Sequence, residues 1–249
     1  MRYSRRGILL GVGIPLLLGL WALRFMCLGL YSLPSDSMMP TLLSGDFVII
    51  NKAAYGLRVP LLDTTILTLG EPRRGDVVVF RYPPDPELLY LKRIAGLPGD
   101  RIAVRRGALS VNGEPVALAA RGRYDDGCYR GMQLAEERLG ARGHRVLYCP
   151  TSADIAVEPL ASCNRRLRRG FVCPAQAADG ARTSDYAEHV IPPGQYFMLG
   201  DNRDNSADGR SYGFVPAANL VGKAVRIWFN WEPARSGGPL WERSGIRVE

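Results

Sequence analysis

Three short segments contain the side chains that could carry out covalent chemistry: residues 34–42 (PSDSMMPTL), 90–100 (YLKRIAGLPGD) and 200–210 (GDNRDNSADGR). Lys92 stands in an otherwise apolar run, where burial would lower the pKa of its side chain from about 10.4 to near 7–8. A neutral amine can accept a proton from a serine hydroxyl, and Ser35 and Ser37 supply two hydroxyls in the first segment. These residue types favour a serine nucleophile activated by a lysine base.

The composition offers few other bases or metal ligands. Of the 32 basic residues only Lys52, Lys92 and Lys223 are lysine, and an arginine keeps its proton in a protein. Only two histidines are present, His144 and His189, and no two cysteines have the short spacing of a zinc site. We therefore expect a site with no metal and no cofactor.

Each of the three segments also has an ordinary interpretation. Ser35 and Ser37 could be turn or cap residues, and Lys92 could extend from an edge strand into solvent. Residues 200–210 could be an Asx-rich turn or a loose calcium loop, although the glutamate that ends an EF-hand loop is missing. The presence of all three segments in one chain, in this order, favours the chemical interpretation.

The N-terminus predicts a membrane anchor. Residues 1–6 contain three arginines, residues 7–23 contain no charge, and the apolar character resumes after Arg24 and lasts to Tyr31. At about 1.5 Å per residue this length spans a hydrocarbon core of about 30 Å. Basic residues before the helix place that end in the cytoplasm, and the small-x-small site of a cleaved signal peptide is missing. We predict a cytoplasmic tail at 1–6 and one transmembrane helix at 7–31.

Charge and cysteine usage agree with a location outside the cytoplasm. The formal net charge of +8 suits a protein lying against anionic lipid or a nucleic-acid binder, and the predicted anchor favours the lipid bilayer and no nucleic acid. Cys27 falls in the predicted anchor. The other cysteines lie within 46 residues of each other: Cys128, Cys149, Cys163 and Cys173. We expect one or two disulfides among these four, and their three possible full pairings stay open.

The rest of the chain predicts a mainly β fold. Strand-like runs between Gly, Pro and Asp turns occupy residues 47–50, 77–81, 89–94, 101–104, 111–116, 195–199 and 221–229, with an Asn-Gly turn signal in the fifth run. Residues 117–190 are rich in arginine, hold the four cysteines and contain one candidate short helix, Met132–Leu139. We predict a β-rich catalytic body made of 32–116 and 191–249, with 117–190 as an inserted subdomain.

Apolar residues near both ends of the body allow two interpretations. Residues 61–69 are apolar for a turn-rich stretch, and the C-terminal part contains Trp228, Phe229, Trp231 and Trp241. Buried core is the default for such side chains. The alternative is a rim of aromatic and aliphatic residues that enters the membrane interface beside the active site.

Taken together, the three segments resemble the type I signal peptidase family, the membrane-bound bacterial leader peptidases. The similarity covers most of residues 34–104 and 191–229, including Tyr55-Gly56 and residues 74–80, and it is weak in the insertion. Each segment alone is modest evidence, whereas all three in order behind an anchor are specific.

The resemblance implies a role for each matched position. Ser37 would be the nucleophile, and Lys92 would be the general base that deprotonates it and later protonates the leaving amine. The Ser35 hydroxyl and the backbone N–H of Ser37 would form the oxyanion hole. Ser206 would hydrogen-bond the lysine amine and hold it in place. Asp208 and Arg210 would form a supporting ion pair.

Two positions depart from the family pattern. Asp36 occupies the place of a familiar glycine between the two serines, and we expect its carboxylate to face solvent, away from Lys92. Gly209 stands where the family often has a serine, which puts one supporting hydrogen bond in doubt.

The resemblance implies a serine endopeptidase of the bacterial inner membrane, with a periplasmic catalytic domain. It would remove signal peptides from exported preproteins after small residues at positions −1 and −3, binding them by strand addition. Three rival functions stay open: a dedicated pilin or conjugation peptidase with the same two residues, a self-cleaving Ser–Lys regulator, and an inactive signal-peptide receptor. The regulator would need a DNA-binding domain, and the intact Ser37, Lys92 and Ser206 argue against the receptor.

Overall fold

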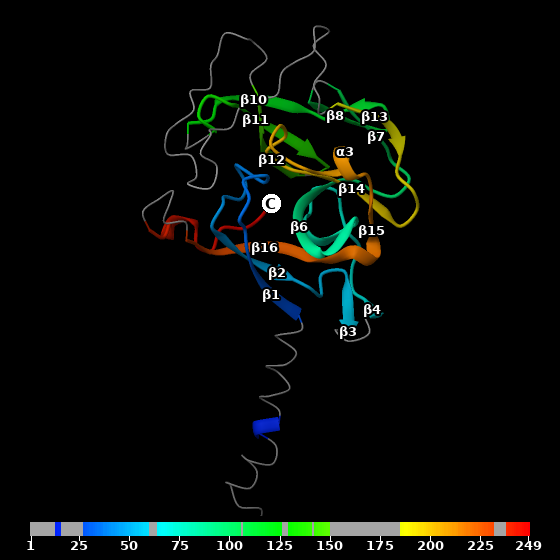
Figure 1. Cartoon of the computed structure of the whole chain (residues 1–249), viewed down its shortest axis with the longest axis vertical. Coiled ribbons are helices and arrows are strands. Elements are labelled where there is room, and N and C mark those ends of the chain that lie inside the picture. The colour runs from blue at the N-terminus through cyan, green and yellow to red at the C-terminus, as the bar shows by residue number, and fades with distance from the viewer. Residues whose placement is uncertain are drawn as a thin grey trace, which may run out of the picture.

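The computed structural model describes residues 13–15, 27–59, 64–105, 107–125, 129–140, 142–149, 185–231 and 238–249. Its described part is mainly β, as the sequence predicts (Figure 1). The largest sheet has seven strands in the order β1-β2-β16-β5-β6-β14-β15. Their bounds are β1 Leu28–Ser32, β2 Asp46–Asn51, β5 Val77–Tyr82, β6 Asp85–Gly96, β14 Gln195–Leu199, β15 Val215–Pro216 and β16 Leu220–Asn230.

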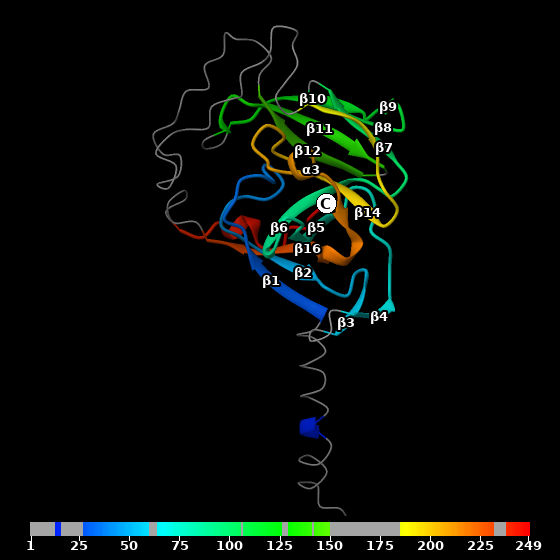
Figure 2. The ribbon, with the colours of Figure 1, turned by 45° about the vertical axis from the view of Figure 1, so that its right-hand side comes forward.

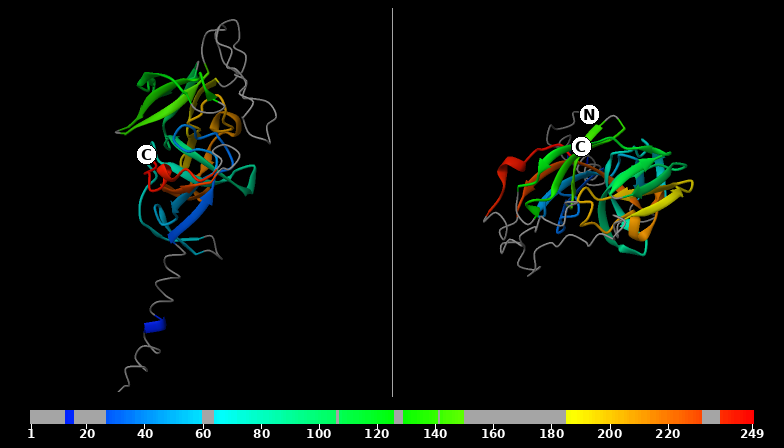
Figure 3. Two further views of the ribbon diagram at one scale, coloured as in Figure 1. Left: turned by 90° about the vertical axis from the view of Figure 1, so that its left-hand side faces the viewer. Right: turned by 90° about the horizontal axis from the view of Figure 1, so that it is seen from above.

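Three smaller sheets accompany it among the described residues. They are β10-β11-β12 (Leu118–Arg123, Gln133–Leu139, Arg142–Tyr148), β13-β7-β8-β9 (Tyr186–Val190, Arg101–Arg105, Ala108–Val111, Glu114–Pro115) and β3-β4 (Gly56–Val59, Thr64–Thr68). Short helical turns follow at α3 Gly209–Tyr212, η3 Ala217–Asn219 and η4 Trp241–Arg243. In Figures 2 and 3 the sheets that contain β7, β8 and β10 to β13 stack on one end of the large sheet, and β3 and β4 lie at the other end.

Local sequence explains the large sheet. Strand β2 (DFVIIN) alternates buried and half-buried residues, as a strand with one face on the core must. Strand β5 begins with three valines and a phenylalanine, all buried, because both of its faces are covered. The hydrophobic core on this sheet also contains Met38 and Leu42 from the loop after β1, which pack with Val48 and Ile50. The loop that carries Ser37 is therefore held by the core itself.

The predicted strands are confirmed, including the hairpin at the Asn-Gly signal. Asn112 and Gly113 join β8 to β9 with φ values of 56° and 84°, the left-handed geometry that a type I′ turn requires.

Two predictions about secondary structure are wrong. The candidate helix Met132–Leu139 is strand β11 from Gln133, paired on both sides with β10 and β12. Residues 28–31, assigned to the transmembrane helix, form most of β1, which pairs with β2 from Leu28↔Asn51 to Ser32↔Phe47. An apolar run cannot show by itself whether its backbone bonds are made within a helix or to a neighbouring strand.

The rest of the predicted anchor, apart from residues 13–15 and Cys27, lies outside the described residues. In the part of the chain that is described, no helix combines the length and the apolar character needed to cross a bilayer.

The predicted insertion contains a sheet of its own, β10-β11-β12, and Cys149 at its end is disulfide-bonded. The predictions for Cys128, Cys163 and Cys173 fall outside the described residues. Strand β13 ends the predicted insertion at Val190 but pairs with β7 of the predicted body. Residues 186–190 therefore share a sheet with residues of the predicted body.

Candidate active site

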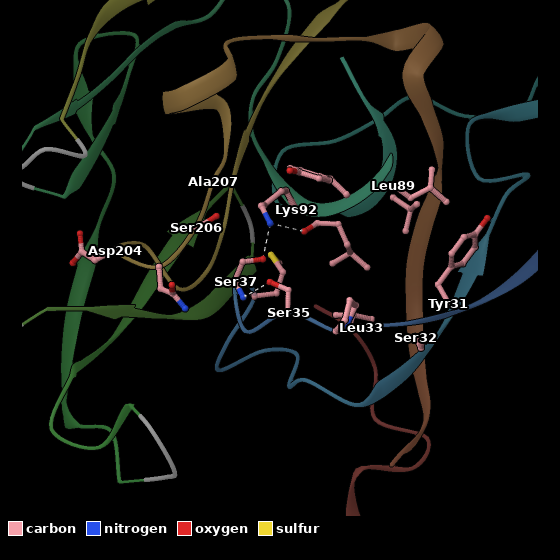
Figure 4. A pocket seen from close by; sticks show the side chains of 16 residues that line it. Tyr31, Ser32, Leu33, Ser35, Ser37, Leu89, Lys92, Asp204, Ser206 and Ala207 are labelled. Carbon is pink, nitrogen blue, oxygen red and sulfur yellow. Dashed lines mark hydrogen bonds between the residues drawn. The ribbon is translucent and has the colours of Figure 1, made fainter. Parts of the chain in front are cut away.

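A cavity of about 570 Å³ lies beside the loop that carries Ser37 (Figure 4). Three segments line most of it: residues 31–35 with 37 and 38, residues 89–92 of β6 and residues 204–207. The three chemical segments of the sequence thus meet at one place. The second and third segments meet because β6 pairs with β14 and the third segment begins directly after β14. The first segment is joined to the third by the Asn202 N–H, which donates to the Ser37 carbonyl oxygen at 3.1 Å.

Ser37 and Lys92 contact each other at the cavity wall. The Lys92 Nζ donates hydrogen bonds to Ser37 Oγ at 2.6 Å and to the Leu91 carbonyl oxygen at 3.2 Å (Figure 4). Ser37 is 8% exposed and Lys92 is 5% exposed, so little water competes for this bond. The Lys92 Nζ also lies 5.6 Å from the ring centre of Tyr90, another residue of the wall.

Burial of the amine lowers the pKa of Lys92 to about 8. The carboxylates of Asp208 and Asp201 oppose this shift, and the Arg210 guanidinium adds to it. A pKa near 8 leaves an appreciable neutral fraction at neutral pH, which is what a lysine needs to act as a base.

The two serines of the first segment are also arranged as a unit. The backbone N–H of Ser37 donates to Ser35 Oγ at 3.2 Å. The Ser37 N–H and the Ser35 hydroxyl therefore lie within hydrogen-bond distance of each other in the loop that carries the Ser37 hydroxyl. Both are groups that can donate to a negatively charged oxygen.

Asp208 and Arg210 form the predicted ion pair. Arg210 donates to the Asp208 carboxylate through Nε at 2.8 Å and through Nη2 at 2.8 Å, and Gly200 N–H donates to it at 3.0 Å. Burial raises the pKa of Asp208, but Arg210, the Gly200 bond and Lys92 outweigh it and hold that pKa below its usual range. Asp208 therefore stays charged and ties the third segment to the end of β14.

Ser206 lines the cavity, but the structure does not contain the hydrogen bond to Lys92 that the resemblance implied. Its hydroxyl oxygen is buried and has no hydrogen-bond partner among the described residues. It packs against Gly200, where a Cβ would lie 2.2 Å from Ser206 Oγ and 2.6 Å from the Ser37 carbonyl oxygen. Glycine at position 200 lets the third segment approach Ser37 closely.

The structure explains one departure from the family pattern and corrects the expectation for the other. A Cβ at Gly209 would lie 2.7 Å from the ring of Phe197 and 2.8 Å from the Met198 carbonyl oxygen, so this chain has no room for a larger residue there. Asp36 does not point into solvent as expected. Its carboxylate accepts a hydrogen bond from Tyr129 at 3.1 Å, because the segment before β11 covers it.

Sequence reasoning missed the roles of Arg93 and Asp201. Arg93 Nε and Nη2 donate to the two Asp201 oxygens at 2.8 and 2.7 Å, with both side chains buried. The available signal was the position of Arg93 directly after Lys92 and of Asp201 at the start of the third segment. Among the described residues no group of three or more His, Cys, Asp or Glu side chains could hold a metal ion.

A buried serine hydroxyl bonded to a lysine of lowered pKa is the arrangement that a serine nucleophile with a lysine base requires. Comparison with known proteins agrees with a serine nucleophile. The family model described as "Signal peptidase, peptidase S26" matches residues 7–229. The chain therefore belongs to the signal peptidase family, peptidase S26, and is a serine peptidase.

Related proteins named signal peptidase I align with most of the chain. It is 37% identical to signal peptidase I of Pseudomonas aeruginosa over 93% of this chain and 76% of that protein. It is 34% identical to signal peptidase I of Aquifex aeolicus over 80% of this chain and 75% of that protein. The crystal structure of a signal peptidase I from Enterococcus faecalis has a TM-score of 0.31 and 22% identity, over 63% of this chain and 98% of that chain. The family assignment accordingly rests on the sequence relationship.

Proposed function

We propose that this protein cleaves N-terminal signal peptides from exported preproteins, with Ser37 as nucleophile and Lys92 as general base. The observation that carries the proposal is the 2.6 Å contact between Lys92 Nζ and Ser37 Oγ at the cavity wall. Family membership supports the substrate class, since the relatives are named signal peptidase I.

The geometry supports a two-step acyl transfer. Lys92 accepts the Ser37 proton while Oγ attacks the scissile carbonyl carbon, and the new oxyanion takes bonds from the Ser37 N–H and the Ser35 hydroxyl. The C–N bond then breaks and Lys92 gives its proton to the leaving amine. In the second step Lys92 deprotonates a water molecule, which attacks the ester carbonyl, and Ser37 recovers its proton as the signal peptide leaves.

The cavity suits an extended peptide with small side chains. Residues 31–35 and 89–91 face it from two sides, so a strand laid between them would bring its carbonyl to Ser37. Leu33, Val79 and Leu91 make much of this wall apolar. We propose that small residues at positions −1 and −3 are selected because larger ones would not fit between these side chains.

The test is cleavage of a preprotein that carries an Ala-x-Ala site by the detergent-solubilised full chain, followed by product mass. We expect one cut directly after the −1 alanine. The matched substrate with phenylalanine at −1 should stay intact. Failure to cut several such preproteins by the folded protein would refute a general signal peptidase, and cleavage of a pilin-type precursor alone would assign a dedicated maturation peptidase.

We further propose that the body lies against the outer face of the bacterial inner membrane, anchored by the N-terminal segment. Cys149 in a disulfide supports an oxidising compartment. Several large apolar side chains are exposed: Leu28, Leu30, Leu67, Leu69, Trp228, Trp231, Trp241 and Ile246. This exposure supports the interfacial rim rather than the buried core for these residues. Phe229, which the sequence placed in the same group, is half-buried and stacks on Phe47 with ring centres 4.4 Å apart.

Trp228 and Trp241 should therefore contribute to activity on a membrane. They are 54% and 70% exposed, and moving a large apolar side chain out of water gains about 1.5–3 kcal/mol. The double variant Trp228→Ser, Trp241→Ser should cleave a preprotein in lipid vesicles at least about tenfold more slowly than the wild type. In detergent the two proteins should be equal.

Leu118→Ser is the matched control for this prediction, because Leu118 is also exposed but lies on β10, away from β1 and β16 (Figure 1). It should have no effect in either medium. Equal rates of the tryptophan variant and the wild type in vesicles would contradict the interfacial rim.

A further inference from the structure

The inserted hairpin, β11 and β12, contacts the loop that follows β14. The N–H of Leu147 on β12 donates to the Asp201 carbonyl oxygen at 2.9 Å, and the N–H of Arg203 donates to the Leu147 carbonyl oxygen at 3.0 Å. Two residues on, the Cys149 N–H donates to the Asp204 carboxylate at 2.7 Å. The hairpin therefore holds the third chemical segment by its backbone (Figure 2).

Charged side chains join the hairpin to the same loop inside the protein. Both Nη groups of Arg203 donate hydrogen bonds to the carboxylate of Glu137 on β11. Arg203 also donates to the Tyr148 hydroxyl at 2.7 Å. His144 Nε2 lies 3.3 Å from Glu137 Oε2 and 3.7 Å from Asp201 Oδ1. All of these side chains are buried. Buried charges are tolerated only with well-placed partners, so this cluster has little freedom to rearrange.

The cluster reaches both members of the Ser37–Lys92 pair. Asp201 accepts the bidentate bond of Arg93, the residue after Lys92 on β6. Asn202, between Asp201 and Arg203, donates its backbone N–H to the Ser37 carbonyl oxygen at 3.1 Å. A shift of this loop would therefore move the Ser37 backbone relative to the Lys92 amine.

We propose that Glu137 and His144 are positioning residues for the Ser37–Lys92 pair, acting through Arg203 and Asp201. The inference rests on the proposed function. It gives the inserted hairpin a part in the active site, although neither Glu137 nor His144 lines the cavity. His144 is surrounded by Glu137 of β11, Asp201 of the loop and Arg93 of β6, and burial together with Arg93 holds its pKa below the usual value. Its neutral ring separates the two carboxylates without adding charge.

Glu137→Gln is the main test. It keeps the shape of the side chain but leaves the buried charge of Arg203 uncompensated. We expect kcat to fall about tenfold with KM within about twofold of the wild type, because the reacting atoms are displaced while the substrate cavity is intact. The uncompensated charge also disfavours the protonated Lys92 amine, so the acid limb of kcat/KM should move to lower pH.

Glu136→Gln is the matched control, since Glu136 is the neighbour on β11 but pairs with Arg121 at the surface. It should change neither rate nor pH profile. His144→Gln makes no change in charge at neutral pH and should lower kcat about threefold, with KM and the acid limb unchanged.

The assay uses the full chain in detergent, with thermal unfolding measured for each variant. Unchanged kcat and an unmoved acid limb in folded Glu137→Gln would overturn the proposal, even if its unfolding temperature were lower. If Glu137→Gln does not fold, the test is the kcat of His144→Gln. A kcat of His144→Gln equal to that of the wild type would overturn the proposal. Failure of the wild type to cleave is a failure of the proposed function and is visible before any variant is compared.

Discussion

Lys92→Met should abolish cleavage while making the folded protein more stable. The variant keeps an unbranched side chain that is one atom shorter and has no amine, so nothing remains to take the Ser37 proton. Loss of one member of a nucleophile–base unit typically costs about 10⁴-fold or more in kcat. The measurement is the initial rate on an Ala-x-Ala preprotein, with the free energy of unfolding of both proteins determined in urea.

The gain in stability follows from the lowered pKa of Lys92. Its pKa is about 8 in the folded protein, against 10.5 for a lysine amine in water, so below pH 8 the folded state is destabilised by keeping the buried amine protonated. That penalty is about 3 kcal/mol at pH 7. It shrinks as the pH rises through 8 and is gone above 10.5, where both states are neutral. The advantage of Lys92→Met should vanish over the same interval.

Ser37→Ala is the control that separates the two effects. It should lose the same activity, because the nucleophile is gone, but it keeps the buried amine and should not gain the same stability. Residual cleavage by either variant at wild-type rates would refute the assignment of the pair. An advantage of Lys92→Met that stays constant up to about pH 11, above the ordinary lysine pKa, would show that burial does not destabilise the charged amine.

Asp208→Asn should weaken the fold and shift the pH profile together. Asp208 is fully buried and compensates Arg210, whose side chain is 5% exposed. Removing one partner of a buried ion pair costs about 3–5 kcal/mol, because the other charge is left without compensation. The Asp208 charge also raises the pKa of Lys92, so its loss lowers that pKa below about 8.

The expected readout is therefore a lower free energy of unfolding together with an acid limb of kcat/KM that begins at lower pH than in the wild type. Glu188→Gln is a suitable control, since Glu188 pairs with Arg101 at the surface, where such a pair is worth about 0–1 kcal/mol. An acid limb that does not move in folded Asp208→Asn would mean that Lys92 is not the group titrating there.

Several features of the site could be read from local sequence because they depend on residue type and spacing. Lys92 in an apolar run predicted a depressed pKa, and the structure gives that depression with burial as its main cause. Asp208 and Arg210 are two residues apart in the chain, so their ion pair is a local contact. The strand runs were visible because β-branched and aromatic residues alternate or cluster there.

Strand β11 shows where local reasoning fails. The segment MQLAEERL consists almost entirely of good helix formers, and its propensity predicts a helix. In the structure its alternate residues Ala135, Glu137 and Leu139 are buried, and β10 and β12 satisfy its backbone on both sides. Pairing with the neighbouring strands β10 and β12 outweighed a preference of a few tenths of a kcal/mol per residue.

The residue types and their spacing alone predicted the two serines, a lysine in an apolar strand, the local Asp208–Arg210 pair and a β-rich body. Only the tertiary structure decided which distant groups surround that chemistry. Glu137 pairs with Arg203, 66 positions away in the chain, and Asp36 accepts a hydrogen bond from Tyr129, 93 positions away. Such contacts depend on the register of paired strands and on the need of each buried charge for a partner. Neither can be predicted from the residues adjacent in the sequence.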